Sequence, residues 1–187
     1  MDLVIRDRQD ADLPALIDLL DRQQAQTKYP FIWPFPGPIE DFLKRRSELR
    51  AWVAELDGSI VGHVAVTTAD DDAIGHSWAA AHGARIDQLR CVSVFFADIT
   101  RTGQGIGSRL LQHATDFASA DGYPVLDVVA AHEKPFNLYL RRGWQLIETT
   151  QAPWHPDTDL PIHLMILPVR DADGAESCNP GDEPVTH

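Results

Sequence analysis

Basic residues are scarce in this chain of 187 residues. It holds 16 lysines and arginines against 28 aspartates and glutamates, and its formal net charge is −12. A protein that follows nucleic-acid phosphates needs a basic face, so we expect no nucleic-acid partner. The acidic balance is compatible with a cationic or amine acceptor, and it serves solubility equally well. The charge therefore excludes one class of partner without selecting another.

Long apolar runs are missing as well. No segment approaches the roughly 20 apolar residues of a membrane span, and residues 1–8 lack the apolar core of a signal peptide. We therefore expect a soluble, cytoplasmic protein with no membrane partner. Two cysteines, Cys91 and Cys178, make no disulfide framework, which agrees with a reducing compartment. The eight histidines show no metal-ligand spacing, so we expect no metal.

The length fits a single domain, which we predict to cover residues 1–170. Residues 171–187 carry acids among small residues and prolines without apolar periodicity, which predicts a disordered acidic tail. Predicted strands occupy residues 3–5, 51–56, 60–66, 88–96, 125–129, 144–150 and 162–169. Predicted helices occupy residues 13–20 with Asp12 as N-cap, 40–50, 106–121 and 133–142. The proline-rich aromatic stretch 29–38 and the polar stretch 69–85 are predicted loops.

A glycine-rich turn, Gly103-Gln-Gly105-Ile-Gly107-Ser108, joins the strand at 88–96 to an amphipathic helix. Glycines let the backbone approach a ligand closely and present several N–H groups together. The helix that follows adds the positive end of its dipole. The turn therefore predicts an anion site suited to a pyrophosphate, with a tight ligand-free turn as the alternative.

Two common nucleotide motifs do not fit this turn. Ser108 stands where the dinucleotide-binding pattern Gly-x-Gly-x-x-Gly needs its third glycine. That pattern also follows the first strand of its fold, whereas four predicted strands precede this turn. A phosphate-binding P-loop would need a lysine, and the turn contains none.

At this point the sequence resembles the GNAT superfamily of N-acetyltransferases, over residues 2–168. The family's loop reads Arg/Gln-x-x-Gly-x-Gly/Ala, and Gly105 and Gly107 match its glycines. Thr102 stands where the family prefers Arg or Gln, and Arg101 lies one position earlier. Because backbone N–H groups carry most of the phosphate binding, this departure weakens the match only slightly.

A second stretch carries the same resemblance. GNAT proteins commonly contain Asn-x-x-Ala-x-x-Leu-Tyr-x-x-x-Gly-Phe after the strand that follows the loop helix. Here Leu138-Tyr139 and Gly143-Trp144 fit the second half at the right spacing. The first half departs, with His132 at the Asn position and Pro135 at the Ala position.

The resemblance implies an α/β fold with a mixed, mainly antiparallel sheet of about seven strands, splayed in the middle and flanked by about four helices. It implies acetyl-CoA as co-substrate, with the pantetheine arm along one strand and the pyrophosphate on the glycine turn. The residues so assigned to the co-substrate are Val92, Ser93, Val94, Phe95, Arg101, Thr102, Gly103, Gln104, Gly105, Ile106, Gly107, Ser108 and His132.

Acyl transfer to an amine needs a proton for the leaving thiolate, a donor to the thioester carbonyl and a base for the amine. The resemblance makes Tyr139 the acid, and a phenol is protonated at neutral pH. The N–H of Val94 or a neighbour is the expected carbonyl donor. Asp87, at the start of its strand, and His63, in the hairpin, are the candidate bases. The alternative for Tyr139 is a core tyrosine with its hydroxyl at the surface, although the surrounding motif favours the catalytic role, and a lone histidine in a strand such as His63 is more often structural.

The acceptor is expected between residues 29–38 and 151–160, which the resemblance makes the specificity-determining segments. Their aromatics and carboxylates suit an amine, although they could equally pin the loops to the core. The predicted function is acetyl transfer from acetyl-CoA to a primary amine of a small molecule or peptide. The alternatives are a non-catalytic acyl-CoA-binding module and a nucleotide-binding oxidoreductase. The exposed aromatic loop could also serve a homodimer interface.

Overall fold

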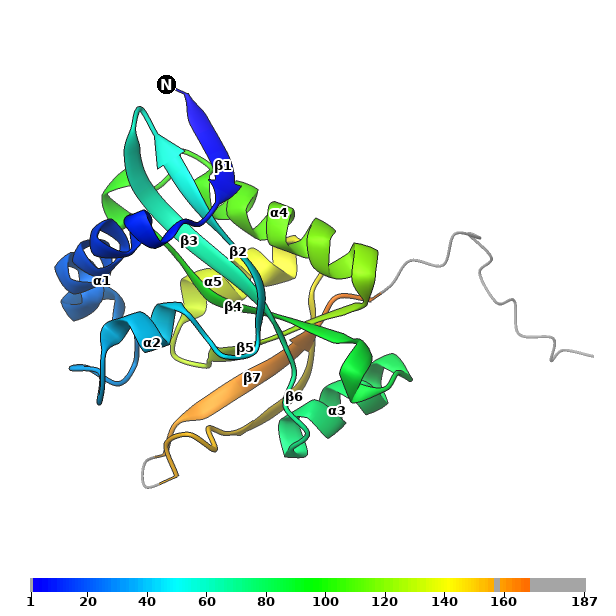
Figure 1. Ribbon diagram of the computed structural model, residues 1–187. Coiled ribbons are helices and arrows are strands. Elements are labelled where there is room, and N and C mark those ends of the chain that lie inside the picture. The colour runs from blue at the N-terminus through cyan, green and yellow to red at the C-terminus, as the bar shows by residue number, and fades with distance from the viewer. Residues whose placement is uncertain (1, 157–158, 169–187) are drawn as a thin grey trace, which may run out of the picture.

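The computed structural model describes residues 2–156 and 159–168 and shows one sheet with helices on both faces (Figure 1). The predicted tail, residues 171–187, lies outside the described residues. The strands are β1 (Leu3–Asp7), β2 (Glu48–Leu56), β3 (Ser59–Thr68), β4 (Leu89–Ala97), β5 (Tyr123–Val129), β6 (Gln145–Gln151) and β7 (Pro161–Ile166). The helices are α1 (Leu13–Thr27), α2 (Ile39–Leu43), α3 (Ala73–His82), α4 (Ile106–Asp121) and α5 (Glu133–Arg141).

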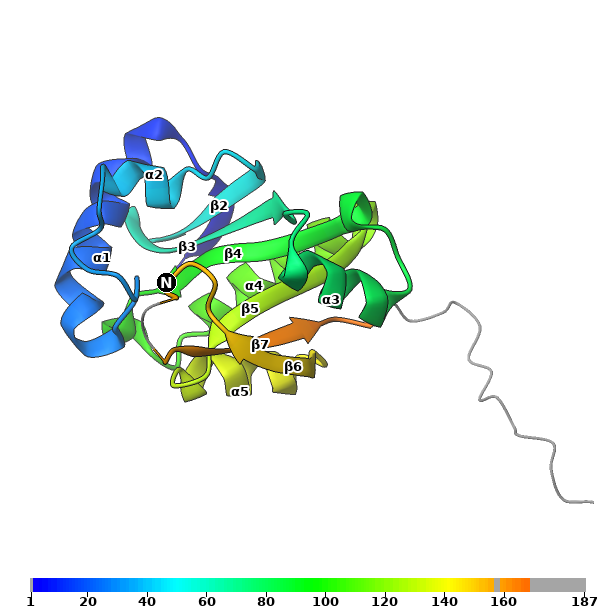
Figure 2. The ribbon, with the colours of Figure 1, turned by 90° about the horizontal axis from the view of Figure 1, so that it is seen from below.

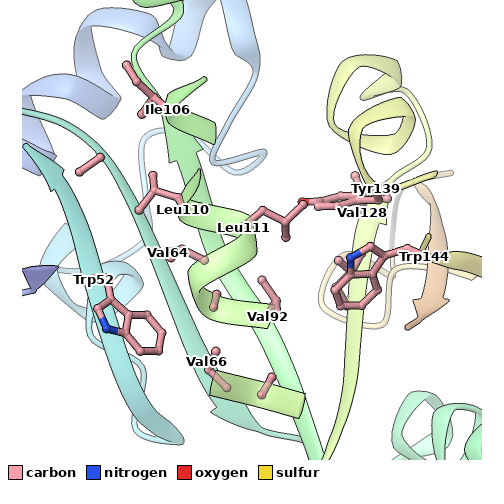
Figure 3. Packing of buried hydrophobic residues seen from close by; sticks show 14 of the residues in the cluster. Trp52, Val64, Val66, Val92, Ile106, Leu110, Leu111, Val128, Tyr139 and Trp144 are labelled. Atoms are coloured by element: carbon pink, nitrogen blue, oxygen red, sulfur yellow. The ribbon is translucent and has the colours of Figure 1, made fainter. Parts of the chain in front are cut away.

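The seven strands lie in the order β1-β2-β3-β4-β5-β7-β6, and all neighbours are antiparallel except β4 and β5. The expected mixed, mainly antiparallel sheet is therefore confirmed. The parallel pair is short, because its ladder joins only Leu89–Cys91 to Tyr123–Val125. Beyond Cys91 and Val125 the two strands separate, and Figure 3 shows them diverging from the point where they meet. We call this gap the β4–β5 opening.

Alternation along the strands sends apolar side chains to both faces of the sheet. Val64 and Val66 of β3 pack under α4, whereas Ala65 between them packs under α1 and α2. On the α4 face one cluster spans the opening, and Figure 3 shows Leu110 and Leu111 among its members.

The opposite face of the sheet carries two separate clusters. One packs α1 and α2 on β2, β3 and β4, and the other packs α3 on β4, β5 and β7. Figure 2 shows α1 and α2 grouped at one end of β3 and α3 at the other. The boundary between these two clusters falls on β4 between Cys91 and Val94, where the β4–β5 opening begins.

Two predicted elements differ from the structure. The helix expected over residues 40–50 ends at Leu43, and β2 begins at Glu48, because Glu48 and Arg50 pair with β3. The loop expected over residues 69–85 contains α3. Asp72 caps this helix by accepting a hydrogen bond from the Gly75 N–H at 2.8 Å, and its small residues pack on the sheet without the periodicity that would have predicted it.

Asp12 precedes α1 as expected, but its carboxylate does not cap that helix. It forms an ion pair with Arg6 at 2.8 Å and accepts a hydrogen bond from the Gln9 N–H. Over the described ranges, no helix combines the length and apolar character needed to cross a membrane.

Candidate active site

A bulge interrupts β4 beside the opening. Between the pairs His63–Phe96 and Ala65–Ser93, two steps on β3 are matched by three on β4, so β4 carries an extra residue there. Val94 accommodates it with a left-handed backbone, at φ +47°, which is unusual for a β-branched residue. Such a conformation persists only where the surroundings hold it, and it is concentrated at functional sites.

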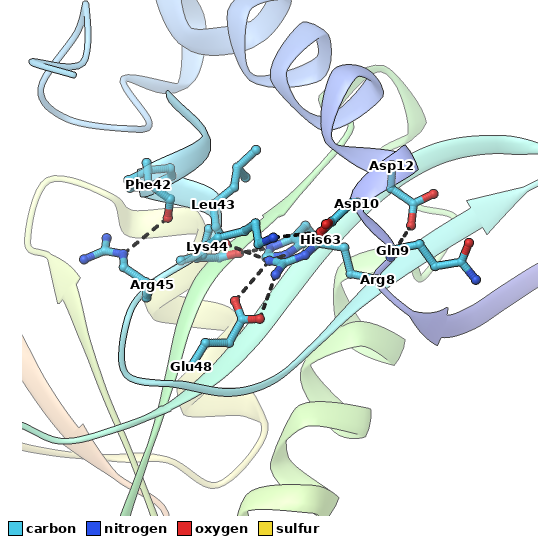
Figure 4. A network of polar contacts seen from close by, with 11 residues as sticks. Arg8, Gln9, Asp10, Asp12, Phe42, Leu43, Lys44, Arg45, Glu48 and His63 are labelled. Atoms are coloured by element: carbon cyan, nitrogen blue, oxygen red, sulfur yellow. Dashed lines mark hydrogen bonds and ion pairs between the residues drawn. The ribbon is translucent and has the colours of Figure 1, made fainter. Parts of the chain in front are cut away.

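A buried polar network holds this bulge (Figure 4). The Val94 carbonyl lies 2.7 Å from Nδ1 of His63, and Nε2 of the same ring lies 3.1 Å from an Arg8 nitrogen. Arg8 also pairs with Glu48 at 2.7 Å and donates to the Leu43 carbonyl at 2.7 Å. Since arginine only donates, we assign a neutral His63 that accepts at Nε2 and donates from Nδ1.

His63 therefore does not fit the role of general base. Its side chain is fully buried, and burial lowers its pKa to about 4. Both ring nitrogens already have protein partners, which leaves none for a substrate proton. We reassign His63 as a positioning residue that holds the bulge.

Asp87 does not reach the opening either. It lies in the 3-10 turn at Ile86–Gln88, next to the end of β4 that is still paired with β5. Its carboxylate is exposed and forms an ion pair with Arg85, which lowers its pKa. The structure thus offers no path from Asp87 to an amine in the opening, and we correct its assignment as a base.

The glycine turn forms an uncapped helix terminus. Gly103 and Gly105 have φ of +87° and +76°, and a Cβ added to either would meet nothing within 4 Å. Gly105 is the N-cap of α4 and has no side chain to cap it. The first bond into the helix runs from the Arg109 N–H to the Gly105 carbonyl at 3.0 Å.

The N–H groups of residues 106–108 consequently have no partner among the described residues. Three such donors at the positive end of a sixteen-residue helix suit the pyrophosphate of a coenzyme A. The Thr102 hydroxyl donates to the Ile99 carbonyl at 2.7 Å, so it stabilises the turn itself. Arg101 is exposed, and His132 is half-buried at the start of α5, where burial lowers its pKa.

Tyr139, on α5, approaches the opening from the α4 face. Its side chain is 5% exposed and lies among the rings of Phe95 and Trp144, each with its centroid 6.1 Å away. Burial raises its pKa, and the charges of Tyr29 and Asp127 on the opposite face raise it further. The phenol is therefore protonated at neutral pH and lies close to groups of the other face.

Two of those groups were missed by sequence reasoning. Tyr29, just after α1, packs its ring on Phe42 and Phe96, with centroids 5.6 Å and 6.1 Å away. Burial raises the pKa of its hydroxyl, and the Phe95 N–H approaches closely enough to oppose that rise. Nothing in the sequence distinguished Tyr29 from the other aromatics of its loop.

Asp127 is the second missed residue, and it stands in the middle of β5. If the β4–β5 ladder continued, Asp127 would face Ser93, whose hydroxyl oxygen is buried without a partner in the described part of the chain. The Asp127 carboxylate has no ion pair or hydrogen bond with another described residue. It is open to water through the gap, yet protein atoms surround it and raise its pKa. A lone carboxylate inside the apolar run Val125–Val129 was the signal that could have found it.

The groups at the opening have the chemical character that an acid, a base and hydrogen-bond donors require. Asp127 is a carboxylate with a raised pKa, which suits a general base. Tyr139 is a protonated phenol, and in the described part of the chain β4 has no ladder partner on the β5 side beyond Cys91. Cys91 is no nucleophile, because burial raises the pKa of its thiol.

The two segments expected to select the acceptor meet over this face. The ring of Phe31 packs edge-on against the rings of Trp154 and His155, with ring centroids 6.3 Å and 5.6 Å away. Asp157 falls outside the described residues. The described carboxylates, histidines and cysteine nowhere converge in a group of three that could hold a metal ion.

Comparison with known structures shows the same fold at low sequence identity. An N-acetyltransferase from Staphylococcus aureus Mu50 matches with a TM-score of 0.67 at 20% identity, over 90% of this chain and 99% of the other. The Salmonella typhimurium protein yncA, solved with its cofactor acetyl-CoA, matches with a TM-score of 0.68 at 18% identity, over 95% and 100%. The ribosomal-protein-S18-alanine N-acetyltransferase from Escherichia coli matches with a TM-score of 0.62 at 14% identity, over 94% of this chain and 100% of the other.

A direct comparison with curated protein sequences finds no match. The family model of the acetyltransferase (GNAT) family matches residues 16–144, which is more than half of the chain. This stretch includes the bulge, the glycine turn and Tyr139. The chain therefore belongs to the acetyltransferase (GNAT) family.

Proposed function

We propose that this protein transfers an acetyl group from acetyl-CoA directly to a primary amine. The observation that carries the proposal is the β4–β5 opening, where the bulge of β4, the Asp127 carboxylate and the Tyr139 hydroxyl converge next to the uncapped start of α4. The acetyl-CoA held by yncA and the N-acetyltransferase names of two structural neighbours support the same chemistry.

The binding roles follow from the backbone. The N–H groups of residues 106–108 would hold the pyrophosphate, and residues 92–95 would pair with the pantetheine amides along the free edge of β4. Bound acetyl-CoA supplies an acetyl group activated as a thioester. The N–H of Val94 or Phe95 would donate to the carbonyl oxygen of that thioester, and the His63 network fixes the bulge that aims it.

The proposed chemical roles rest on the position of Asp127 and Tyr139, which lie on β5 and α5 beside the opening. Asp127 takes a proton from the ammonium group of the acceptor, and the neutral amine then attacks the carbonyl carbon. A C–N bond forms as the C–S bond breaks. Tyr139 donates its proton to the leaving thiolate and regains one from the nitrogen of the new amide, while Asp127 releases to solvent the proton that it took from the ammonium group. Nothing else is consumed.

The test is a calorimetric titration with CoA beside an assay of thiol release from acetyl-CoA across a panel of amines. We expect CoA to bind and thiol release to depend on at least one amine. An absence of CoA binding would contradict the proposal, and NAD(P) binding in its place would favour the oxidoreductase alternative.

The variant Tyr139→Phe separates an enzyme from a non-catalytic acyl-CoA-binding module. We expect its kcat to fall about 100-fold, within the range for loss of a general acid, while its CoA affinity is unchanged. Tyr123→Phe, at the start of β5 beside His82, is the matched control and should keep full activity. If wild type and Tyr139→Phe are equally inert toward every amine while both bind CoA, the protein is a binding module.

A further inference from the structure

Arg45 lies at the outer end of an aromatic wall on the acceptor face. Its Nε donates to the Phe42 carbonyl at 3.3 Å, and its guanidinium carbon lies 5.1 Å from the centre of the Phe42 ring. That ring packs edge-on against Tyr29, whose ring centroid also lies 6.1 Å from that of Phe96 on β4. Among the described residues, the two terminal guanidinium nitrogens have no other partner. The rings of Phe42 and Tyr29 thus connect the Arg45 guanidinium to Phe96 of β4, and the charge of Arg45 acts on Asp127 of β5.

The charges of Arg45 and Asp127 act on the same two neighbouring groups, Tyr29 and Cys91, although the two residues form no ion pair. Burial raises the pKa of Tyr29, Cys91 and Asp127, and in all three cases the positive charge of Arg45 opposes that rise. Asp127 in turn raises the pKa of Tyr29 and Cys91. Yet Arg45 and Asp127 form no ion pair with one another. Both side chains are exposed, and neither the Asp127 carboxylate nor the terminal guanidinium nitrogens of Arg45 have a hydrogen-bonding partner among the described residues, so both are available to a ligand that carries both charges.

We infer that the acceptor is a small zwitterion of the amino-acid type, with its amine at Asp127 and its carboxylate or similar anion at Arg45. This inference rests on the proposed function and names its substrate class. The amine end is assigned to Asp127 because the transfer takes place in the opening. The anionic end is assigned to Arg45 because a guanidinium fork matches a carboxylate with two parallel hydrogen bonds.

The other acceptor classes meet this surface less well. A polyamine would bring a second positive charge toward Arg45. A peptide N-terminus has an amide where an amino acid has its carboxylate, so it would leave the guanidinium without an anion. Acetylation removes the positive charge of the amine and its attraction to Asp127, while the negative charge remains, so the product is expelled by the same carboxylate that bound the substrate.

The experiment compares amino acids with the amines that remain when their carboxylate is removed. Thiol release from acetyl-CoA is measured for the twenty common amino acids and for matched amines such as isoamylamine for leucine, phenethylamine for phenylalanine and histamine for histidine. We expect the best amino acid to exceed its matched amine at least about tenfold in kcat/KM, as the loss of one charge-assisted bidentate contact predicts.

Two variants test the two ends of the site. Arg45→Gln should remove the preference for the carboxylate-bearing member of each pair, while Arg46→Gln, the exposed neighbouring arginine, should leave it intact. Asp127→Asn should lower kcat by about 100-fold or more without changing CoA affinity, and should remove the acidic limb of the pH–rate profile. Thermal melts confirm that each variant is folded.

The outcomes distinguish a failure of the proposed acetyl transfer from a failure of the proposed substrate class. If CoA does not bind, or no amine of any kind is acetylated, the proposed function fails and takes this inference with it. If CoA binds and amines are acetylated equally well with and without a carboxylate, only the inference is overturned. The same holds if Arg45→Gln leaves the preference unchanged.

Discussion

The two sides of the opening are built in different ways. On the proposed co-substrate side, consecutive backbone N–H groups after Gly105 would bind the anion, in one uninterrupted stretch of chain. On the proposed acceptor side, Tyr29, Arg45 and Asp127 come from three separate segments and would act through their side chains. A backbone site depends on glycines and helix geometry, whereas a side-chain site depends on distant packing. The first therefore tolerates substitution of its side chains, and the second does not.

The largest expected effect is a loss of CoA affinity that leaves the proposed acceptor side unchanged. Gly105→Asp places bulk and a negative charge in the open space before α4, and we expect CoA affinity to fall about 1000-fold or more, beyond detection by calorimetry. Gly58→Asp is the matched control, because Gly58 has φ +80° in the β2–β3 turn and equally open surroundings. If Gly105→Asp keeps its affinity while folded, the pyrophosphate lies elsewhere.

The second effect tests whether the bulge depends on tertiary packing. Arg8→Met leaves Glu48 without its partner and His63 without its donor in a region where the two charged side chains are 5% and 18% exposed. We expect the free energy of unfolding to fall by about 3–5 kcal/mol in denaturant titrations. Lys44→Met removes the exposed pair with Asp10 and should lower the free energy of unfolding far less than Arg8→Met does, because water screens that pair. Equal losses would show that the Arg8 network is no more than a surface pair.

The third effect is a pH dependence that originates in His63. Burial lowers the pKa of His63 to about 4 in the folded protein, whereas an ordinary exposed histidine, as in the unfolded chain, has a pKa of 6.5. Between pH 6.5 and pH 4 the unfolded chain therefore takes up a proton that the folded chain does not. Stability should therefore fall by up to about 3 kcal/mol as the pH drops from 6.5 to 4. The slope should diminish in His63→Asn and persist in His76→Asn, whose histidine is exposed. An unchanged slope in His63→Asn would assign the effect to other groups.

The smallest effect sharpens the contrast between backbone and side chain. Thr102 stands where the family prefers Arg or Gln, and its hydroxyl only stabilises the turn. Because backbone N–H groups carry the anion site, we expect Thr102→Gln to change CoA affinity by less than about threefold in calorimetry. A tenfold gain would mean that a side chain at this position contributes a phosphate contact of its own.

Secondary structure was predictable where the pattern is periodic. The amphipathic stripe from Ile106 to Ala118 and the Asp57-Gly58 hairpin were both confirmed. The errors fell where tertiary pairing decides: Glu48 joins a strand because β3 is beside it, and α3 forms from small residues with little periodicity. The predicted acid Tyr139 lies at the opening, whereas the candidate bases Asp87 and His63 do not serve it.

The sequence alone determined the glycine turn, its helix and the family resemblance, because these depend on residues that are close neighbours along the chain. Only the tertiary structure decided that Asp127 stands in the opening and that His63 is buried behind the bulge. The reason is that β4 and β5 separate after three paired residues, and the register at that point follows from the packing of helices on both faces. A lone carboxylate inside an apolar strand is a signal in the sequence, but only that gap places Asp127 where we propose that the amine binds.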